Sequence, residues 1–261
     1  AGSLVVGADG IHSGIRAQMN PVEGPPVWGG AVLWRSTTMA KPFRTGASMA
    51  MIGHDTQRIV AYPISPVDPD TGMVVMNWIA ELSYDPSAGW NKEDWNRKVG
   101  KEEFLPQFEN WVFDWLDFPS WVHQSDTIYE YPMVDRDPLN SWTDGKATLM
   151  GDAAHATYPV GSNGASQAII DARKLGRAFV DHGTTTDALN FYEDEMRPAS
   201  TRIIEANRGR GGPDAVLQLI EDRCEGRFHT IDDVASYEEL AEFEEVGACG
   251  TAAVISPIKG V

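Results

Sequence analysis

The sequence predicts an α/β (α+β) protein, because two apolar strands lead directly into glycine turns and helices, and a run of further strands lies between them. The first apolar strand, at residues 4–6, precedes a Gly-Asp-Gly turn. The second, at residues 148–150, precedes a Gly-Asp turn, a loop rich in Gly and Pro, and a helix. Residues 27–83 form apolar or β-branched stretches separated by Gly, Pro and Asp, which is typical of a mostly antiparallel sheet.

The segment after the second strand has the pattern of a ligand site. Asp152, just past the strand end, is well placed to accept a hydrogen bond from a hydroxyl such as that of a sugar or sugar alcohol. The helix that starts near Gly164 would direct backbone N–H groups and its positive end toward an electron-rich group. Gly161 and Gly164 allow the backbone to approach a flat ring closely. In the alternative interpretation, the glycines serve only the turn.

The remaining elements follow from the spacing of apolar residues. Turn residues separate four expected strands, Trp28–Met39, Ser48–Met51, Arg58–Ile64 and Met73–Leu82. Aromatic residues at helical spacing predict two helices with core side chains, Asn91–Phe104 and Gln107–Leu116. The core side chains expected there are Trp95, Val99, Phe108, Trp111 and Trp115. A strand at Asp126–Val134 is followed by helices at Ala165–Asp181, at Thr186–Arg208 with an interruption at Pro198, and at Asp214–Arg223.

Two segments together carry a family resemblance. They are LVVGADGIHSGIR at the start of the chain and TLMGDAAHATYPVGSNGASQAIID at residues 148–171. In this order they resemble the two later FAD-site fingerprints of the class A flavin-dependent aromatic hydroxylases. Further stretches are similar to the branch that contains methylphenazine-carboxylate monooxygenase and the salicylate hydroxylase-like enzymes: GGAVLWRSTT, RIVAYPIS, VVMNWIAEL, DWNRK, YEYPMVDRDPL, FYEDEMRPA and IIEANR. The resemblance covers roughly residues 1–240.

The resemblance implies FAD as cofactor, NAD(P)H as co-substrate and a small aromatic or heteroaromatic substrate. In this family, O2 adds to the reduced flavin to give a C4a-hydroperoxide, which hydroxylates the ring. The flavin carries this chemistry, so no catalytic side chain and no metal are expected. The implied cofactor-binding residues are Gly7, Asp9, Gly10, Arg16, Gly151, Asp152, Pro159, Gly161, Ser162, Asn163 and Gly164.

Four residues are candidates for contact with the substrate. Arg35 lies within an apolar strand, where a charge needs a partner. It either faces the cavity and pairs with a substrate carboxylate or phenolate, or it lies at a strand edge in solvent or beside a structural acid. Tyr62 and Trp78 are candidates for stacking on a ring, with core packing as the alternative. Pro159 is the first residue of the loop that the resemblance places against the flavin. His155 follows the Gly-Asp turn closely and is expected to form a local hydrogen bond rather than to act as a base.

One expected motif is missing from the sequence. The family begins with a βαβ unit that carries G-x-G-x-x-G, and no such pattern occurs in these 261 residues. We therefore expect the C-terminal part of an FAD/NAD(P)-binding flavoprotein hydroxylase fold, with an antiparallel substrate-domain sheet, no N-terminal βαβ unit and a missing N-terminal half. The expected domains are a partial FAD-binding domain (1–20), a substrate-binding sheet domain (21–135), the FAD-binding continuation (136–208), a helical segment (209–240) and an atypical tail (241–261).

Composition limits the partners of the chain. A formal net charge of −17 argues against nucleic acid and anionic membranes, which repel an acidic surface. No apolar run approaches the roughly 20 residues that a membrane helix requires, so a cytoplasmic protein without integral membrane association is expected. The tail at 241–261 resembles a segment of branched-chain aminotransferases, but it is too short to fold alone and is assigned no function.

Two alternatives to the hydroxylase interpretation remain open. The first is a related FAD enzyme that oxidises without hydroxylating, or a demethylating monooxygenase, because the same motifs serve all of these. The second is an inactive fragment or a cofactor-free binding module, which the absent βαβ unit favours.

Overall fold

The computed structural model describes residues 3–89, 96–159, 164–209, 213–225 and 227–241. The chain divides into two compact units, one formed by Ala1–Gly29 with Val134–Val261 and the other by Gly30–Met133. The tail at 242–261, which includes nearly all of the aminotransferase-like segment, lies outside the described residues. Among the helices of the described ranges, none is long and apolar enough to cross a membrane.

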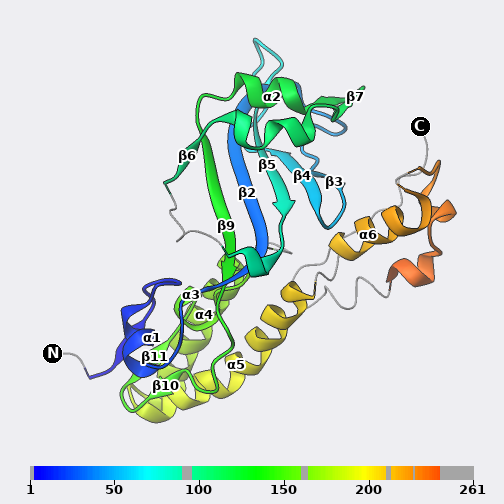
Figure 1. Ribbon diagram of the computed structural model, residues 1–261. Coiled ribbons are helices and arrows are strands. Elements are labelled where there is room, and N and C mark those ends of the chain that lie inside the picture. The colour runs from blue at the N-terminus through cyan, green and yellow to red at the C-terminus, as the bar shows by residue number, and fades with distance from the viewer. Residues whose placement is uncertain (1–2, 90–95, 160–163, 210–212, 226, 242–261) are drawn as a thin grey trace. The chain divides into compact units, whose positions relative to one another are not determined.

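The first unit contains a small sheet with helices packed against it (Figure 1). Its strands, in the order β1-β11-β10, are β1 (Val5–Gly7), β11 (Ala147–Leu149) and β10 (Thr143–Asp144). Its helices are α1 (Gly14–Met19), α3 (Asp152–His155), α4 (Gly164–His182), α5 (Thr186–Arg208), α6 (Pro213–Cys224) and the 3₁₀ turn η5 (Ile231–Asp233). Strand β1 runs parallel to β11, whereas β10 and β11 form an antiparallel hairpin. The hairpin turn contains Gly145 at a φ of 56°, as a tight two-residue loop requires.

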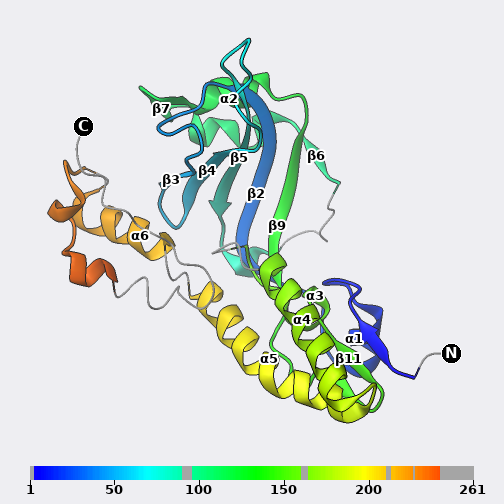
Figure 2. The ribbon, with the colours of Figure 1, turned by 180° about the vertical axis from the view of Figure 1, so that it is seen from behind.

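The helices α4 and α5 lie side by side and antiparallel, as Figures 1 and 2 both show. Their inward faces, which include Leu175 of α4 and Tyr192 of α5, pack with Trp142 and Leu149 in the core of this unit. The sequence placed both helices correctly to within one residue, because their apolar residues recur at helical spacing. The expected interruption at Pro198 is wrong, since α5 continues past this residue.

The second unit is built on a six-stranded sheet in the order β3-β4-β5-β2-β9-β6. The strands are β2 (Val27–Ala40), β3 (Ala50–Gly53), β4 (Gln57–Pro63), β5 (Val74–Ser83), β6 (Lys98–Val99) and β9 (Ile128–Asp135). The pairs β3–β4, β4–β5, β2–β5 and β6–β9 are antiparallel. The short elements are η1 (Pro86–Ala88), η2 (Lys101–Glu103), η3 (Leu105–Phe108), β7 (Val112–Phe113), β8 (Leu116–Asp117) and α2 (Phe118–Gln124). The mostly antiparallel sheet predicted from residues 27–83 is confirmed.

An aromatic cluster covers one face of this sheet. Trp34 stacks on Phe104 with ring centroids 5.0 Å apart, and Trp78 meets Phe118 edge-on at 5.3 Å. Strand pairing places Ser36 opposite Trp78, and side chains alternate between faces along a strand. Trp34, Ser36 and Trp78 therefore share the covered face, and Arg35 points to the other.

The two helices expected at residues 91–116 are wrong. Residues 90–95 lie outside the described ranges, and the rest of the segment forms 3₁₀ turns and two-residue strands. Gly100 and Pro106 interrupt any continuous helix. Phe108 is buried as expected, whereas Trp115 is 47% exposed. Aromatic spacing of three or four residues arises here from successive tight turns rather than from helices.

Candidate functional site

The two sequence motifs of the first unit meet because their strands pair in parallel. Gly7, the last residue of β1, lies opposite Leu149, the last residue of β11, and the Met150 N–H donates to the Gly7 carbonyl at 3.0 Å. The carboxyl ends of parallel strands lie at one edge of a sheet, where ligands of open α/β sheets bind. The Gly-Asp-Gly and Gly-Asp turns therefore leave the sheet side by side.

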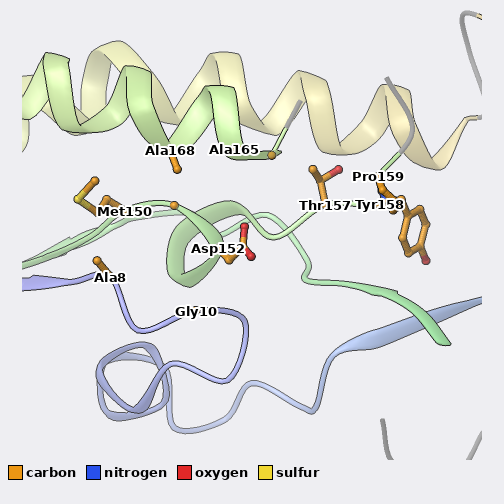
Figure 3. A pocket seen from close by; sticks show the side chains of 11 residues that line it. Ala8, Gly10, Met150, Asp152, Thr157, Tyr158, Pro159, Ala165 and Ala168 are labelled. Carbon is orange, nitrogen blue, oxygen red and sulfur yellow. The ribbon is translucent and has the colours of Figure 1, made fainter. Parts of the chain in front are cut away.

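A pocket of about 590 Å³ opens at this edge (Figure 3). It is lined by the two turns, the following loop and the first turn of α4. The lining residues are Ala8, Gly10, Met150, Gly151, Asp152, Thr157, Tyr158, Pro159, Gly164, Ala165 and Ala168. Its size is in the range of pockets that bind small molecules or parts of cofactors.

Asp152 is the polar side chain best placed to contact a ligand in this pocket. It is exposed at the start of α3, and its carboxylate projects toward the α4 side of the pocket in Figure 3. Within the described part of the chain, no hydrogen bond to this carboxylate is formed. Gly151 precedes it with a φ of 59° and a ψ of −145°, a conformation open essentially only to glycine. The turn thus presents a carboxylate that can accept ligand hydroxyls.

Two buried side chains, His155 and Asp171, stabilise this turn through hydrogen bonds. The Asp171 carboxylate accepts the Gly151 N–H at 2.8 Å and lies 2.6 Å from His155 Nε2. All three residues are buried. The hydrogen bond of His155 therefore reaches a residue in the middle of α4 rather than one within its own turn. Sequence reasoning missed Asp171, because an acidic residue inside a helix carries no local signal of its partner.

The Asp9 side chain is engaged at the start of α1. Its carboxylate accepts hydrogen bonds from the Ser13 hydroxyl at 2.5 Å and from the Gly14 N–H at 2.8 Å. Burial acts to raise the pKa of Asp9, but these hydrogen bonds together lower it below its ordinary value. Gly10, which follows at a φ of 81°, lines the pocket. Within this motif, the aspartate caps a helix and the second glycine faces the ligand space.

Arg16 is buried and does not belong to the lining of the pocket. Its guanidinium donates to the Glu23 carboxylate at 2.5 and 2.7 Å and to the carbonyls of Ala153, Ala154 and Asp137 at 2.8–3.1 Å. These contacts use all five of its N–H groups. Arg16 thereby ties α1 to α3, the helix that carries the exposed carboxylate of the site.

Gly7 has a packing role. A Cβ at this position would lie 2.8 Å from Leu149 Cδ2 and 2.9 Å from Ile15 Cβ, so only glycine allows β1, β11 and α1 to approach this closely. This contact explains the residue without a ligand, and the expected contact of Gly7 with the cofactor stays a prediction.

The loop on the far side of the pocket is anchored by α5. Asn207 Nδ2 donates to Thr157 Oγ1 at 2.8 Å and to the Tyr158 carbonyl at 3.2 Å. Pro159 is exposed and lines the pocket, and Gly164 starts α4 beside it. The expected cofactor residues Gly161, Ser162 and Asn163 lie outside the described residues. Sequence reasoning missed Thr157 and Asn207, whose pairing joins positions 50 residues apart.

In the second unit, two of the substrate candidates lie on the same face of the sheet. Arg35 is exposed, and its Nη2 donates to Asn77 Oδ1 at 3.1 Å. Asn77 is paired directly with Tyr62 of β4, which is half-buried on the same face. Trp78 lies on the opposite face, fully buried, with its indole N–H bonded to the Ser125 hydroxyl at 3.0 Å. Its packing in the aromatic cluster accounts for Trp78, as the alternative interpretation of the sequence expected.

Comparison with known proteins identifies the family to which the sequence is similar. The model of the family described as FAD binding domain matches residues 2–207. Phenazine 1,6-dicarboxylic acid hydroxylase PhzS of Lysobacter antibioticus is 42% identical over 209 residues, which are 80% of this chain and 51% of the relative. The 3-amino-4-hydroxybenzoate 2-monooxygenase PtnB3 of Streptomyces platensis is 30% identical over 244 residues, which are 89% of this chain and 57% of the relative.

Solved structures share the fold. HpxO of Klebsiella pneumoniae, complexed with FAD and uric acid, superposes with a TM-score of 0.65 at 19% identity, over 95% of this chain and 56% of that one. A salicylate hydroxylase substrate complex superposes with a TM-score of 0.63 at 17% identity, over 96% of this chain and 65% of that one. The predicted flavoprotein hydroxylase fold is confirmed. The chain spans about half the length of the curated relatives that it matches.

Proposed function

The chain belongs to the FAD binding domain family, and on this basis we propose that it forms the larger part of the flavin and substrate sites of an FAD-dependent monooxygenase that hydroxylates an aromatic or heteroaromatic ring. One observation carries the proposal. An exposed carboxylate, Asp152, faces a pocket at the carboxyl ends of two parallel strands. The resemblance of both flanking turns to flavin-site fingerprints agrees with this geometry.

In this proposal, the chain binds the flavin half of FAD. The Asp152 carboxylate accepts a hydrogen bond from the ribityl chain, and Gly10 leaves room for it on the opposite wall. The 19-residue helix α4 starts at Gly164, so its N-terminal backbone groups stabilise negative charge on the ring. Pro159, which is exposed and lines the pocket, would contact the ring edge. Gly161, Ser162 and Asn163, which the resemblance also assigns to the flavin, lie outside the described residues. FAD, when bound, would pass two electrons from NAD(P)H to O2, so that one oxygen atom enters the aromatic ring and the other leaves as water.

The proposed substrate is an aromatic carboxylic acid. The names of the two relatives describe enzymes that act on a phenazine dicarboxylic acid and on an aminohydroxybenzoate. Arg35 provides an exposed guanidinium on the sheet face that also carries Tyr62. Guanidinium groups bind carboxylates through paired charge-assisted hydrogen bonds. Arg35 would orient the acid group and Tyr62 would contact the ring.

We further propose that residues outside the printed sequence hold the adenosine half of FAD. The sequence contains no G-x-G-x-x-G, and the matched relatives are about twice as long as the aligned region. The N-terminal half of a relative, added in trans, is therefore expected to strengthen the binding of FAD.

Titration of the purified chain with FAD, followed by flavin fluorescence and the visible spectrum, tests this function. Asp152→Ala is expected to weaken binding about 10-fold, through loss of charge-assisted hydrogen bonds in the pocket. Asp144→Ala, at the opposite end of the same small sheet, is the matched control and should bind FAD like the parent chain. The absence of FAD binding, both alone and with the added N-terminal half, would refute the proposal.

Product analysis distinguishes hydroxylation from simple oxidation. The complemented protein is supplied with NADH or NADPH, 18O-labelled O2 and an aromatic acid. Incorporation of the label into the ring is expected. Hydrogen peroxide release without incorporation would instead identify an oxidising flavoprotein.

A further inference from the structure

Asp171 places a carboxylate inside the fold, where packing alone would favour an apolar side chain. It lies in the middle of α4 at 0% exposure, beside the core of the first unit. Burial of a charged carboxylate is costly unless hydrogen bonds compensate for it. A neutral apolar residue would fill this space without that cost, so the hydrogen bonds of Asp171 need an explanation.

Asp171 forms two hydrogen bonds, and both reach the turn that carries Asp152. One Asp171 oxygen, Oδ2, accepts the Gly151 N–H at 2.8 Å and contacts His155 Nε2 at 2.6 Å. Gly151 is the residue that precedes α3, and its N–H has no partner within that helix. Asp171 thus satisfies an otherwise unpaired donor of a residue held at a φ of 59°.

The same oxygen fixes the two ends of α3. Gly151 and His155 lie at opposite ends of this four-residue helix, and Asp152 is its first residue. The Tyr192 hydroxyl also lies near this group, where burial and the Asp171 charge raise the pKa of Tyr192. Its hydroxyl donates to the carbonyl of Leu149, the last residue of β11, at 3.3 Å. The backbone on both sides of the Gly-Asp turn is therefore held by one buried group of side chains.

We propose that Asp171 is a positioning residue for cofactor binding: together with His155 it fixes the Gly151 peptide and thereby directs the Asp152 carboxylate into the pocket. The proposal rests on the proposed function, in which this pocket holds the ribityl part of FAD. Asp171 itself does not line the pocket and acts through Asp152. A residue that supports only the fold would change FAD binding whether or not Asp152 is present.

A double-mutant cycle separates these roles. FAD dissociation constants are measured for the chain, with its N-terminal complement if that is needed for binding, as parent, Asp152→Ala, Asp171→Ala and the double variant. Asp171→Ala is expected to weaken binding about 10-fold in the parent and by less than about 2-fold in the Asp152→Ala background. Asp171→Asn retains an acceptor oxygen for both donors and should restore binding to within about 3-fold of the parent. Equal weakening by Asp171→Ala in both backgrounds would overturn the proposal.

Amide hydrogen exchange provides a second measurement that does not depend on FAD. Asp171→Ala should remove the protection of the Gly151 N–H, whereas Asp181→Ala, an exposed change on the same helix, should leave it intact. Retained protection in Asp171→Ala would refute the positioning role even if FAD binds. If the parent chain binds no FAD but Gly151 loses protection, the proposed function fails and the hydrogen-bond assignment stands. If Asp171→Ala does not fold, His155→Ala is measured in its place, because it removes one of the two hydrogen bonds of Asp171. His155→Ala is expected to weaken FAD binding about 3-fold when Asp152 is present and to have little effect in the Asp152→Ala background.

Discussion

Replacement of Arg16 by methionine tests whether this arginine supports the site rather than binding the cofactor. Arg16 is 1% exposed, and its five N–H groups reach one carboxylate and three carbonyls. Methionine fills a similar volume but leaves all four acceptors without this donor. Loss of one member of a buried ion pair costs about 3–5 kcal/mol. The partner Glu23 keeps 18% of its side chain exposed, so water compensates in part and we expect about 3 kcal/mol.

Urea unfolding followed by far-UV circular dichroism measures this loss. Arg16→Lys is expected to lose nearly as much stability, because one ammonium group cannot reach both the carboxylate and the α3 carbonyls. Arg173→Met, at an exposed position of α4, is the matched control and should change stability by less than about 0.5 kcal/mol. The reasoning is refuted if Arg16→Met unfolds within about 1 kcal/mol of the parent, or if Arg16→Lys keeps its stability but loses FAD binding.

Three further predictions follow from the geometry of the two units. Gly7→Ala should cost about 1–3 kcal/mol of unfolding free energy in denaturant titrations, because its Cβ would lie 2.8 Å from Leu149; unchanged stability would contradict this close packing. The pKa of Asp9 is lowered in the folded chain, so the carboxylate contributes fully to stability above its ordinary pKa of 3.8, and this contribution is lost as the pH falls below that value. Asp9→Asn should therefore flatten the acid limb of a stability–pH curve. An equally steep acid limb would count against the helix cap. Trp78→Ala should lower the free energy of unfolding by about 3–5 kcal/mol. Arg35→Ala, on the other face of the sheet, should change it by less than about 0.5 kcal/mol but weaken the binding of aromatic acids. The reverse pattern would overturn the assignment of the two faces.

The sequence predicts the regular elements of this chain better than its irregular ones. The strands from Trp28 to Leu82 have turn residues at both ends of each apolar stretch, so their bounds are set locally. The long helices at residues 164–208 have continuous apolar periodicity. The segment after residue 96 has aromatic residues at comparable spacing, but Gly100 and Pro106 divide it into short turns whose arrangement depends on the sheet they cover.

The candidate site shows the same division between local and distant information. Asp152 could be predicted because it lies just past a strand end, and Gly151 because the turn needs an unusual backbone conformation. Asp171 and Asn207 could not, since they pair with residues 16 to 50 positions away and only the packing of α4 and α5 brings them there. Periodicity identifies which face of a helix is buried, but it does not identify the partner of a polar residue on that face.

The residues of the two motifs therefore have two different roles, although within each motif they are close together in the sequence and cannot be distinguished there. Gly10 and Asp152 face the pocket, whereas Gly7, Asp9 and Arg16 fix the backbone that positions them. The second kind is restricted by close packing and buried hydrogen bonds, whereas the first is proposed to contact the ligand. Exposure and hydrogen bonding distinguish them, because a residue that binds a ligand needs free donors or acceptors at an accessible surface. Within the first motif, all five N–H groups of Arg16 are already bonded inside the fold. Substitutions at such positions should change stability before they change the intrinsic affinity for a ligand.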